Sequence, residues 1–288
     1  MNIIKTIIPA AGFGTRFLPW TKAIPKEMLP LLNKPALQFV VEEGLMSDIK
    51  QFIMITARHK DAITDHFDTC PELESVLKEK NKRDLIVGLD RIIKQAEFTY
   101  IRQSEQLGLG HAIWMARHLI FKEYFGVMLP DDIIFSKTPA LSQLIRIARQ
   151  EKASVLAVQE VPSDQVSSYG IISIKKQITP SLFQVQDLIE KPKPKDSPSN
   201  LAIVGRYILS PKIFASLDTI EPSAGGELQL TDGISSMIKN NEKVFAYKLQ
   251  GIRHDIGTPP GWMKANIFLA LQDPLYASQI KSYLQEIL

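Results

Sequence analysis

A short apolar run that ends in a loop of glycines and cations most constrains the fold of this chain. Residues 3–8 are apolar and mostly β-branched and are followed by Pro9, which predicts a short buried strand. The loop contains Gly12 and Gly14, then an arginine and two lysines, with prolines at positions 19, 25, 30 and 35. Glycines allow a backbone to approach an anion closely, and prolines lower the entropic cost of holding that geometry. The loop therefore predicts an anion-binding site.

The segments after the loop predict an α/β fold. Residues 36–49 carry apolar side chains at helical spacing, and residues 51–56 form a second apolar run. Strand, loop, helix and strand in this order form a βαβ unit, which implies a parallel sheet with ligands at the carboxyl ends of its strands. The alternation continues with strands expected at 98–101, 125–129 and 153–159 and helices at 110–121 and 140–150.

The pattern changes after residue 161. Strands are expected at 169–174, 183–189 and 201–209, with few helices between them and a proline-rich polar loop at 191–200. We predict an inserted β-rich layer that covers the first half of the chain. Helices return at 211–217, 227–239, 261–271 and 277–288, with a strand at 244–249. Because no repeat or low-complexity linker interrupts the sequence, we expect residues 1–288 to form one domain.

Charge and composition argue against several classes of function. The net charge is only +3, without a run of like charges or a basic stripe interleaved with aromatics, so we expect no nucleic-acid partner. No apolar run approaches the roughly 18 residues of a membrane span, and the N-terminus does not resemble a signal peptide. Cys70 is the single cysteine, which precludes an intrachain disulfide and suits a reducing compartment. We therefore expect a cytoplasmic protein.

The glycine loop departs from two common phosphate-binding motifs. A dinucleotide fingerprint would place a third glycine where Phe17 stands and an acidic residue at the end of the second strand, and both are missing. The Gly-Lys-Ser/Thr of a P-loop is also missing. Instead, Arg16, Lys22 and Lys26 follow the glycines, so backbone N–H groups and an arginine fork could hold phosphate oxygens together.

Two further stretches carry groups suited to a nucleotide. In residues 102–112, the amide of Gln103 and the bare backbone at Gly108 could face a pyrimidine, whose edge offers both an N–H and carbonyl oxygens. The alternative is a helix start whose glycines allow close packing, with His111 as a packing or capping residue. Asp131 follows a predicted strand, and Asp255 lies in an Asp-x-Gly turn. Either could be a structural turn residue, and Asp131, at the ligand edge of a parallel sheet, could instead bind Mg²⁺ together with phosphate oxygens.

Taken together, these stretches resemble the sugar-nucleotide pyrophosphorylases. Residues 12–30 read Gly-x-Gly-Thr-Arg-x-x-Pro-x-Thr-Lys-x-x-Pro-Lys-Glu-Met-Leu-Pro, which is similar to the family signature. The Thr-Lys-Ala-Ile-Pro-Lys-Glu-Met-Leu-Pro form resembles the uridylyltransferase branch, whereas thymidylyltransferases typically carry Ser-Lys-Gln-Leu-Leu-Pro. Residues 102–112, Tyr169-Gly170, Glu190-Lys191-Pro192 and residues 199–207 also match, so the resemblance covers nearly the whole chain.

The resemblance implies a Rossmann-like three-layer nucleotidyltransferase fold with a mixed, mostly parallel central sheet. It implies Mg²⁺-dependent transfer of UMP from UTP to glucose 1-phosphate, which gives UDP-glucose and pyrophosphate. Residues 1–160 would mainly bind nucleotide, residues 161–260 would mainly bind the sugar phosphate, and residues 261–288 would form C-terminal helices in a homodimer or homotetramer. The alternatives are a thymidylyltransferase, another sugar-1-phosphate nucleotidyltransferase, or a non-catalytic module that senses nucleotide sugars.

The resemblance also implies the residues of the site. Those for the nucleotide are Ala10, Ala11, Gly12, Gly14, Thr15, Arg16, Lys26, Glu27, Gln103, Gly108 and Asp131. Those for the sugar phosphate are Gly170, Glu190, Lys191, Val204 and Gly205. Catalysis would depend on Arg16, Lys26, Asp131 and Lys191, and the metal ligands would be Asp131 and Asp255, with Asp132 behind them.

Overall fold

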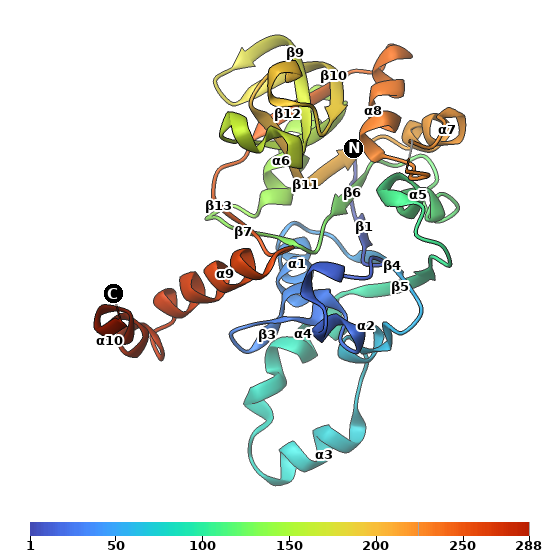
Figure 1. The fold of residues 1–288 in the computed structure, drawn as a ribbon. Helices are drawn as coiled ribbons and strands as arrows, with labels where there is room; N and C mark the ends of the chain where they lie inside the picture. The colour runs from blue at the N-terminus through green and yellow to red at the C-terminus, as the bar shows by residue number, and fades with distance from the viewer. Residues whose placement is uncertain (224, 288) are drawn as a thin grey trace.

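The computed structural model describes residues 1–223 and 225–287, which fold around a nine-stranded sheet (Figure 1). The strand order is β5-β4-β1-β6-β11-β8-β12-β10-β9. The strands are β1 Lys5–Pro9, β4 Gln51–Thr56, β5 Glu97–Arg102, β6 Phe125–Met128, β8 Ser154–Glu160, β9 Gly170–Thr179, β10 Leu182–Glu190, β11 Leu201–Leu209 and β12 Val244–Lys248. Two short pairs lie outside this sheet, β2 Pro30–Leu31 with β3 Lys34–Pro35 and β7 Asp132–Phe135 with β13 Ile252–Asp255. The predicted α/β class with a mixed central sheet is confirmed.

The β-rich half extends the sheet and is not a layer over the first half, which corrects the predicted arrangement. Strands β5, β4, β1 and β6 pair in parallel, and β11 then pairs antiparallel with both β6 and β8. Strand β12 is parallel to β8, while β10 and β9 continue antiparallel to the far edge. The reason is that β11 satisfies the open hydrogen-bonding edge of β6, which joins the two halves through backbone bonds.

Helices cover both faces of the sheet, because successive strand residues point to opposite sides. Ile7 belongs to one buried cluster and Ile8 to the other. The helices are α1 Ala36–Met46, α2 Asp61–His66, α3 Pro71–Glu79, α4 Val87–Gln95, α5 Gly108–Met115, α6 Ala140–Glu151, α7 Lys212–Thr219, α8 Leu230–Lys239, α9 Pro259–Gln272 and α10 Ala277–Ile287. Within the described residues, none of them combines the length and apolar character needed to cross a membrane.

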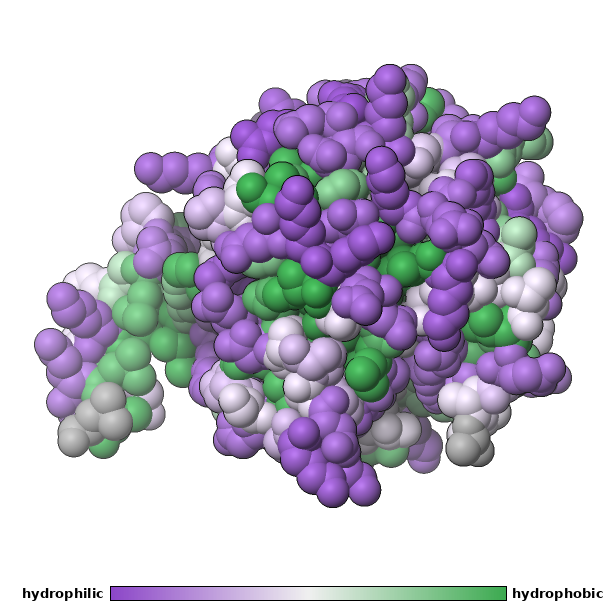
Figure 2. All heavy atoms as spheres, turned by 90° about the horizontal axis from the view of Figure 1, so that it is seen from above, coloured by the Kyte–Doolittle hydropathy of each residue, from purple (hydrophilic) through white to green (hydrophobic). Residues whose placement is uncertain are grey.

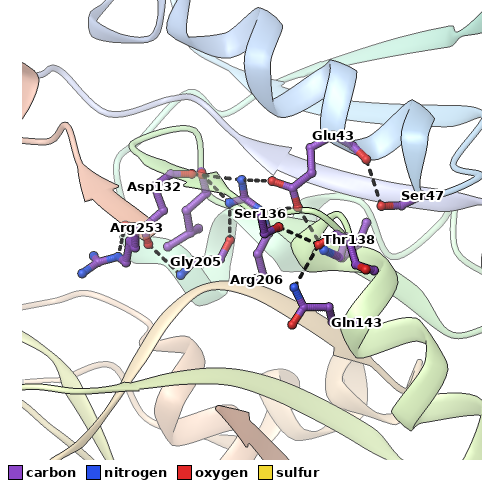
Figure 3. Close-up of polar contacts among 11 residues, drawn as sticks. Glu43, Ser47, Asp132, Ser136, Thr138, Gln143, Gly205, Arg206 and Arg253 are labelled. Atoms are coloured by element: carbon purple, nitrogen blue, oxygen red, sulfur yellow. Dashed lines mark hydrogen bonds and ion pairs between the residues drawn. The ribbon is translucent and has the colours of Figure 1, made fainter. Parts of the chain in front are cut away.

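A buried ion pair joins helix α1 to strand β11 (Figure 3). The side chain of Arg206 is fully buried, and its Nη2 atom lies 2.8 Å from Oε2 of Glu43. The same guanidinium donates to the backbone carbonyls of Leu129 at 3.1 Å and Asp132 at 2.9 Å. Arg206 therefore holds the turn between β6 and β7 in place. That turn carries Asp131, and Asp132 is the first residue of β7.

Candidate active site

Two adjoining cavities lie at the carboxyl ends of the parallel strands, with volumes of about 360 Å³ and 290 Å³. Of the predicted site residues, the first cavity is lined by Ala11, Gly12, Lys26, Gln103, Gly108, Asp131, Glu190 and Lys191. The second is lined by Arg16, Asp131, Gly170, Glu190, Lys191, Gly205 and Asp255. Asp131, Glu190 and Lys191 belong to both linings, so they lie where the cavities meet.

The glycine loop after β1 packs against Lys26. Gly14 has a φ of +67°, a left-handed conformation that glycine adopts at little cost. The hydroxyl of Thr21 donates to the Gly14 carbonyl oxygen at 2.8 Å. A Cβ atom on Gly14 would lie 3.0 Å from Cβ of Lys26, so the lysine stem packs directly on the glycine. This packing directs Lys26 toward the first cavity.

Lys26 forms an ion pair with Asp131 across the first cavity. The Nζ atom of Lys26 lies 2.8 Å from Oδ2 of Asp131. Burial alone would raise the pKa of Asp131, but the ammonium outweighs it and holds that pKa below its usual value. Burial would likewise lower the pKa of Lys26, but Asp131 and Glu27 raise it. Both groups are therefore charged near neutral pH.

Glu27 does not line either cavity, which corrects its predicted contact with the nucleotide. Its side chain is buried, and its two oxygens accept from Nζ of Lys60 at 2.8 Å and 3.0 Å. Burial lowers the pKa of Lys60, while Glu27 opposes that shift. Glu27 thus fastens the turn that carries Lys26 to the start of α2.

Arg253 joins two acidic residues beside the second cavity, and its contact with Asp132 is drawn in Figure 3. Its Nε atom lies 2.5 Å from Oδ1 of Asp132, and its Nη2 atom lies 3.5 Å from Oδ2 of Asp255. The pairing of β7 with β13 places Asp132 opposite Asp255. The other oxygen of Asp132 accepts from the backbone N–H of Gly205 at 2.6 Å. Both oxygens of Asp132 therefore have partners within the protein.

Asp131, Asp255 and Arg16 converge on one point beside Gly257. A Cβ atom on Gly257 would lie 3.0 Å from Oδ1 of Asp255, 3.3 Å from Oδ2 of Asp131 and 3.7 Å from Nη1 of Arg16. The N–H of Ile256 donates to the Asp131 carbonyl at 2.8 Å, which ties the two acidic segments together. In the described part of the chain, no cluster of three or more His, Cys, Asp or Glu side chains could hold a metal. Two carboxylates suit Mg²⁺ when phosphates and water complete its shell.

Gln103 is buried at the wall of the first cavity and is oriented by His111. Its Nε2 atom lies 2.8 Å from Nδ1 of His111. Since an amide nitrogen only donates, His111 accepts through Nδ1 and carries its proton on Nε2. Burial lowers the pKa of His111, which favours this neutral form. The carbonyl oxygen and second N–H of Gln103 are then left to face a ligand.

Packing against the segment before α8 explains Gly108. Its φ is +93°, and a Cβ atom there would lie 2.8 Å from the carbonyl oxygen of Leu228. The N–H of Leu228 donates to the Leu107 carbonyl at 2.7 Å, so the two segments are bonded backbone to backbone. This contact also delays the start of α8 to Leu230, three residues after the predicted start. Gly108 still lines the cavity, so its close packing and its predicted place beside the nucleotide coexist.

The second cavity presents a carboxylate and an ammonium side by side. The Oε2 atom of Glu190 accepts from the hydroxyl of Thr231 at 3.0 Å, and its Oε1 atom lies 3.5 Å from Nζ of Lys191. Lys191 has a φ of +47°, which its N–H supports by donating to the Tyr169 carbonyl at 2.9 Å. A Cβ atom on Gly170 would lie 2.8 Å from Thr231. The glycine thus allows the Thr231–Glu190 contact.

Val204 points away from the second cavity, which corrects its predicted role there. Residues Ile203 and Gly205 line the cavity, and because side chains alternate along β11, Val204 falls on the opposite face. Val204 belongs to the buried cluster on that side of the sheet. Three further predicted residues, Ala10, Gly14 and Thr15, are outside both linings and shape the loop instead.

The polar side chains that line these cavities outside the predicted set include Gln106, Gln229 and Arg253. Gln106 lines the first cavity and donates to the Ala11 carbonyl at 2.9 Å, which ties the glycine loop to the segment before α5. Gln229 lines both cavities, and Arg253 lines the second. Arg253 could have been found from strand alternation, because it lies two residues before Asp255 and so shares its face.

This architecture agrees with the comparisons with known proteins. The chain matches the model of the Nucleotidyl transferase family over residues 5–272 and belongs to that family. It is therefore a nucleotidyltransferase, as the sequence motifs predict.

The relatives narrow the class further. The chain is 48% identical over 287 residues to the UTP–glucose-1-phosphate uridylyltransferase of Staphylococcus haemolyticus, with 99% of each chain covered. It is 46% identical over 286 residues to that of Staphylococcus epidermidis, also with 99% of each covered. A UDP-glucose pyrophosphorylase solved with UDP-glucose has 37% identity and a TM-score of 0.88 over 94% of this chain and 100% of that one. The UTP-bound UGPase from Acinetobacter baumannii has 34% identity and a TM-score of 0.91 over 100% of both chains. The names of these relatives support the predicted similarity to the uridylyltransferase branch over the thymidylyltransferase branch.

Proposed function

We propose that this protein is a UTP–glucose-1-phosphate uridylyltransferase, which transfers UMP from UTP to glucose 1-phosphate and releases pyrophosphate. The observation that carries this proposal is the pair of cavities that meet at Asp131. Lys26 lies on the nucleotide side of that junction, and Lys191 lies at the junction itself. Two phosphorylated substrates can therefore bring their phosphates together between fixed cations.

The first cavity suits UTP. Backbone N–H groups near Gly12 would bind phosphate oxygens. Lys26, together with Arg16 from the adjoining second cavity, would neutralise the triphosphate and the leaving pyrophosphate. The amide of Gln103, held by His111, would pair with the uracil edge.

The second cavity suits glucose 1-phosphate. Glu190 would accept hydrogen bonds from sugar hydroxyls, and Lys191 would hold the phosphate. An oxygen of that phosphate attacks the α-phosphorus of UTP, a P–O bond forms, and the bond to pyrophosphate breaks. A phosphomonoester carries a charge of about −1.5 to −2 near neutral pH, so its attack requires no general base. The protein accelerates the step by positioning the substrates and neutralising charge.

The donor set beside Gly257 suits Mg²⁺, which we propose as the cofactor. Asp131 and Asp255 would hold it, since their oxygens converge on one point and carboxylates are hard oxygen ligands. The ion would supply positive charge between the two phosphates. Asp132 would act indirectly, because Arg253 and Gly205 already occupy its oxygens.

The experiment is an assay of pyrophosphate and UDP-glucose with purified protein, UTP, glucose 1-phosphate and Mg²⁺. Both products should form in equal amounts and disappear when EDTA is added. A folded protein that yields neither product would refute the proposal. Competition with dTTP tests the thymidylyltransferase alternative, and we expect UTP to be used at least tenfold more efficiently, which is about 1.4 kcal/mol of discrimination.

Lys191 and its neighbour Lys193 provide a matched pair of variants. Both lysines are exposed, but only Lys191 lines the cavities. Lys191→Ala should raise the KM for glucose 1-phosphate by about 10- to 100-fold, as expected for a lost charge-assisted contact, with little change in UTP affinity. Lys193→Ala should behave as wild type. Equal losses for both substrates would contradict the assignment of Lys191.

We also propose that residues 1–288 act as a single domain within a homodimer or homotetramer. Both halves share one sheet, in which β11 of the second half lies between β6 and β8 of the first. Helices α9 and α10 project from the rest of the molecule as an arm (Figures 1 and 2). The arm exposes the apolar side chains of Met263, Ile267, Leu271, Leu275 and Tyr283. Such a surface suits a second copy of the chain. Light scattering tests this, and a monomer at micromolar concentration would contradict it. A cytoplasmic location stays a prediction.

A further inference from the structure

The carboxylate proposed as a metal ligand is already paired with a lysine. The Nζ atom of Lys26 lies 2.8 Å from Oδ2 of Asp131. The same Oδ2 atom would lie 3.3 Å from a Cβ atom on Gly257, a position that also has Asp255 and Arg16 beside it. A metal ion bound between the two aspartates would therefore compete with the Lys26 ammonium for this one oxygen of Asp131.

The two cations cannot share that oxygen at low cost. An ammonium within hydrogen-bond distance and a divalent ion on the same atom would repel each other strongly in a partly buried site. The side chains of Lys26 and Asp131 are only 23% and 32% exposed, so water screens this repulsion weakly. Binding of the metal therefore requires Lys26 to leave Asp131.

Lys26 has a second anion within its own cavity. Its stem is anchored on Gly14, while Lys26, Gly12 and Asp131 line the same first cavity. A rotation about the side-chain bonds of the lysine can move the ammonium from Asp131 toward a phosphate held near Gly12. The backbone at Lys26 need not move, because the next residue, Glu27, is held in place by its hydrogen bonds with Lys60.

We propose that Lys26 is an exchangeable counter-ion: it neutralises Asp131 until a nucleotide triphosphate draws it away, which frees the carboxylate for the metal. This inference rests on the proposed function and adds a rule for the order of events at its site. Lys26 opposes binding of a metal ion by itself and favours binding of the triphosphate. Metal and nucleotide then reinforce each other through one side chain, and by linkage each must raise the affinity for the other equally.

The test measures two affinities of opposite expected sign, without any turnover. Mn²⁺ alone is titrated and followed by electron paramagnetic resonance, and UTP alone is titrated by calorimetry in metal-free buffer. Lys26→Met should bind Mn²⁺ about tenfold more tightly than wild type and UTP about tenfold more weakly, as expected from removing one partner of a partly buried charge pair. The control is Lys50→Met, which removes an exposed lysine that lines neither cavity and should change neither affinity.

The location of the Mn²⁺ site is tested in the double variant Lys26→Met with Asp131→Asn, in which the gain in Mn²⁺ affinity should vanish. If Lys26→Met does not fold, Lys26→Gln provides the same comparison. Unchanged or weaker Mn²⁺ binding in the Lys26 variants would overturn the exchange, as would a gain that persists without Asp131. A loss of both affinities would show that Lys26 only supports the fold. Because no step of the test requires catalysis, its outcome is independent of the UDP-glucose assay.

Discussion

Arg253 lies between two aspartates, with its Nε atom 2.5 Å from Oδ1 of Asp132 and its Nη2 atom 3.5 Å from Oδ2 of Asp255. The guanidinium is largely buried, and Asp132 in turn accepts from the backbone of Gly205. One side chain therefore sets the distance between the turn after β6 and the end of β13. Asp131 and Asp255, the proposed metal ligands, lie on these two segments.

Removing the Arg253 side chain should slow catalysis, because the two proposed metal ligands would no longer be held at a fixed distance. We expect Arg253→Ala to lower kcat by about 10- to 100-fold and to raise the Mg²⁺ concentration needed for half-maximal activity, since residues that orient metal ligands have effects of this size. Arg253→Lys, which retains the charge but not the fork, should retain part of the activity. Kinetics at varied Mg²⁺ measure both effects, with Arg146→Ala on the exposed face of α6 as the control. An unchanged Mg²⁺ dependence in Arg253→Ala would contradict the positioning role.

The buried pair of Glu43 and Arg206 should be a major determinant of stability. Glu43→Gln leaves the fully buried guanidinium without a counter-ion, which should lower the free energy of unfolding by about 3–5 kcal/mol. The neighbouring Glu42 pairs with Lys34 near the surface, so Glu42→Gln should cost less than about 1 kcal/mol. Urea denaturation followed by circular dichroism compares the two variants. Equal losses would mean that burial of the first pair is not decisive.

Gly205 should not tolerate even a methyl group. A Cβ atom there would lie 2.5 Å from Oδ2 of Asp132 and 2.7 Å from Cβ of Leu129. Gly205→Ala must displace Asp132, so it should lower the free energy of unfolding by about 1–3 kcal/mol and reduce activity as well. Gly88→Ala, where the added methyl meets no atom, is the matched control. Thermal unfolding and initial rates measure the two effects, and a Gly205→Ala variant with wild-type behaviour would contradict the close packing.

Affinity for UTP should depend on the protonation state of His111. Burial lowers the pKa of His111 below its usual value of about 6.5, with Glu105 opposing and Arg117 reinforcing that shift. The neutral ring accepts from Gln103, whereas a protonated Nδ1 would face another donor. The affinity for UTP should therefore be highest above pH 6.5 and should decline as the pH falls through the lowered pKa of His111.

Calorimetry at pH 7.5 and pH 5.5 tests this dependence. The control is His111→Asn, whose amide oxygen can accept from Gln103 but does not titrate. Protonation of UTP itself affects both proteins equally, so the decline should be steeper in wild type than in His111→Asn. Identical declines would show that His111 does not act through its charge.

Much of the fold follows from local sequence patterns. Strands β4 and β11 have the predicted bounds, because each is a mainly apolar run that is buried along almost its whole length. Strands β7 and β13 were not predicted as a pair, since they are four residues each and carry Asp132 and Arg253. Their stability depends on an ion pair between residues more than a hundred positions apart, which periodicity cannot reveal.

The sequence predicts a site residue where its chemical type is sufficient to identify it. It does not predict whether a side chain is oriented toward the cavity. Lys26, Gln103 and Asp131 line the first cavity as expected from charge and hydrogen-bonding capacity. Glu27 and Val204 also lie in family motifs, but their side chains do not line the cavities, because one pairs with Lys60 and the other lies on the opposite face of β11. A motif identifies a stretch of backbone, whereas the partner or register of each side chain depends on the tertiary structure.

Direct transfer between two substrates held at Asp131, without a protein nucleophile, is tested most directly by stereochemistry at the α-phosphorus. The measurement uses UTP made chiral by sulfur at that phosphorus, glucose 1-phosphate and Mg²⁺, and determines the configuration of the UDP-glucose product. One in-line displacement predicts inversion. Retention would require two displacements through a uridylyl-enzyme and would contradict direct transfer in adjoining cavities.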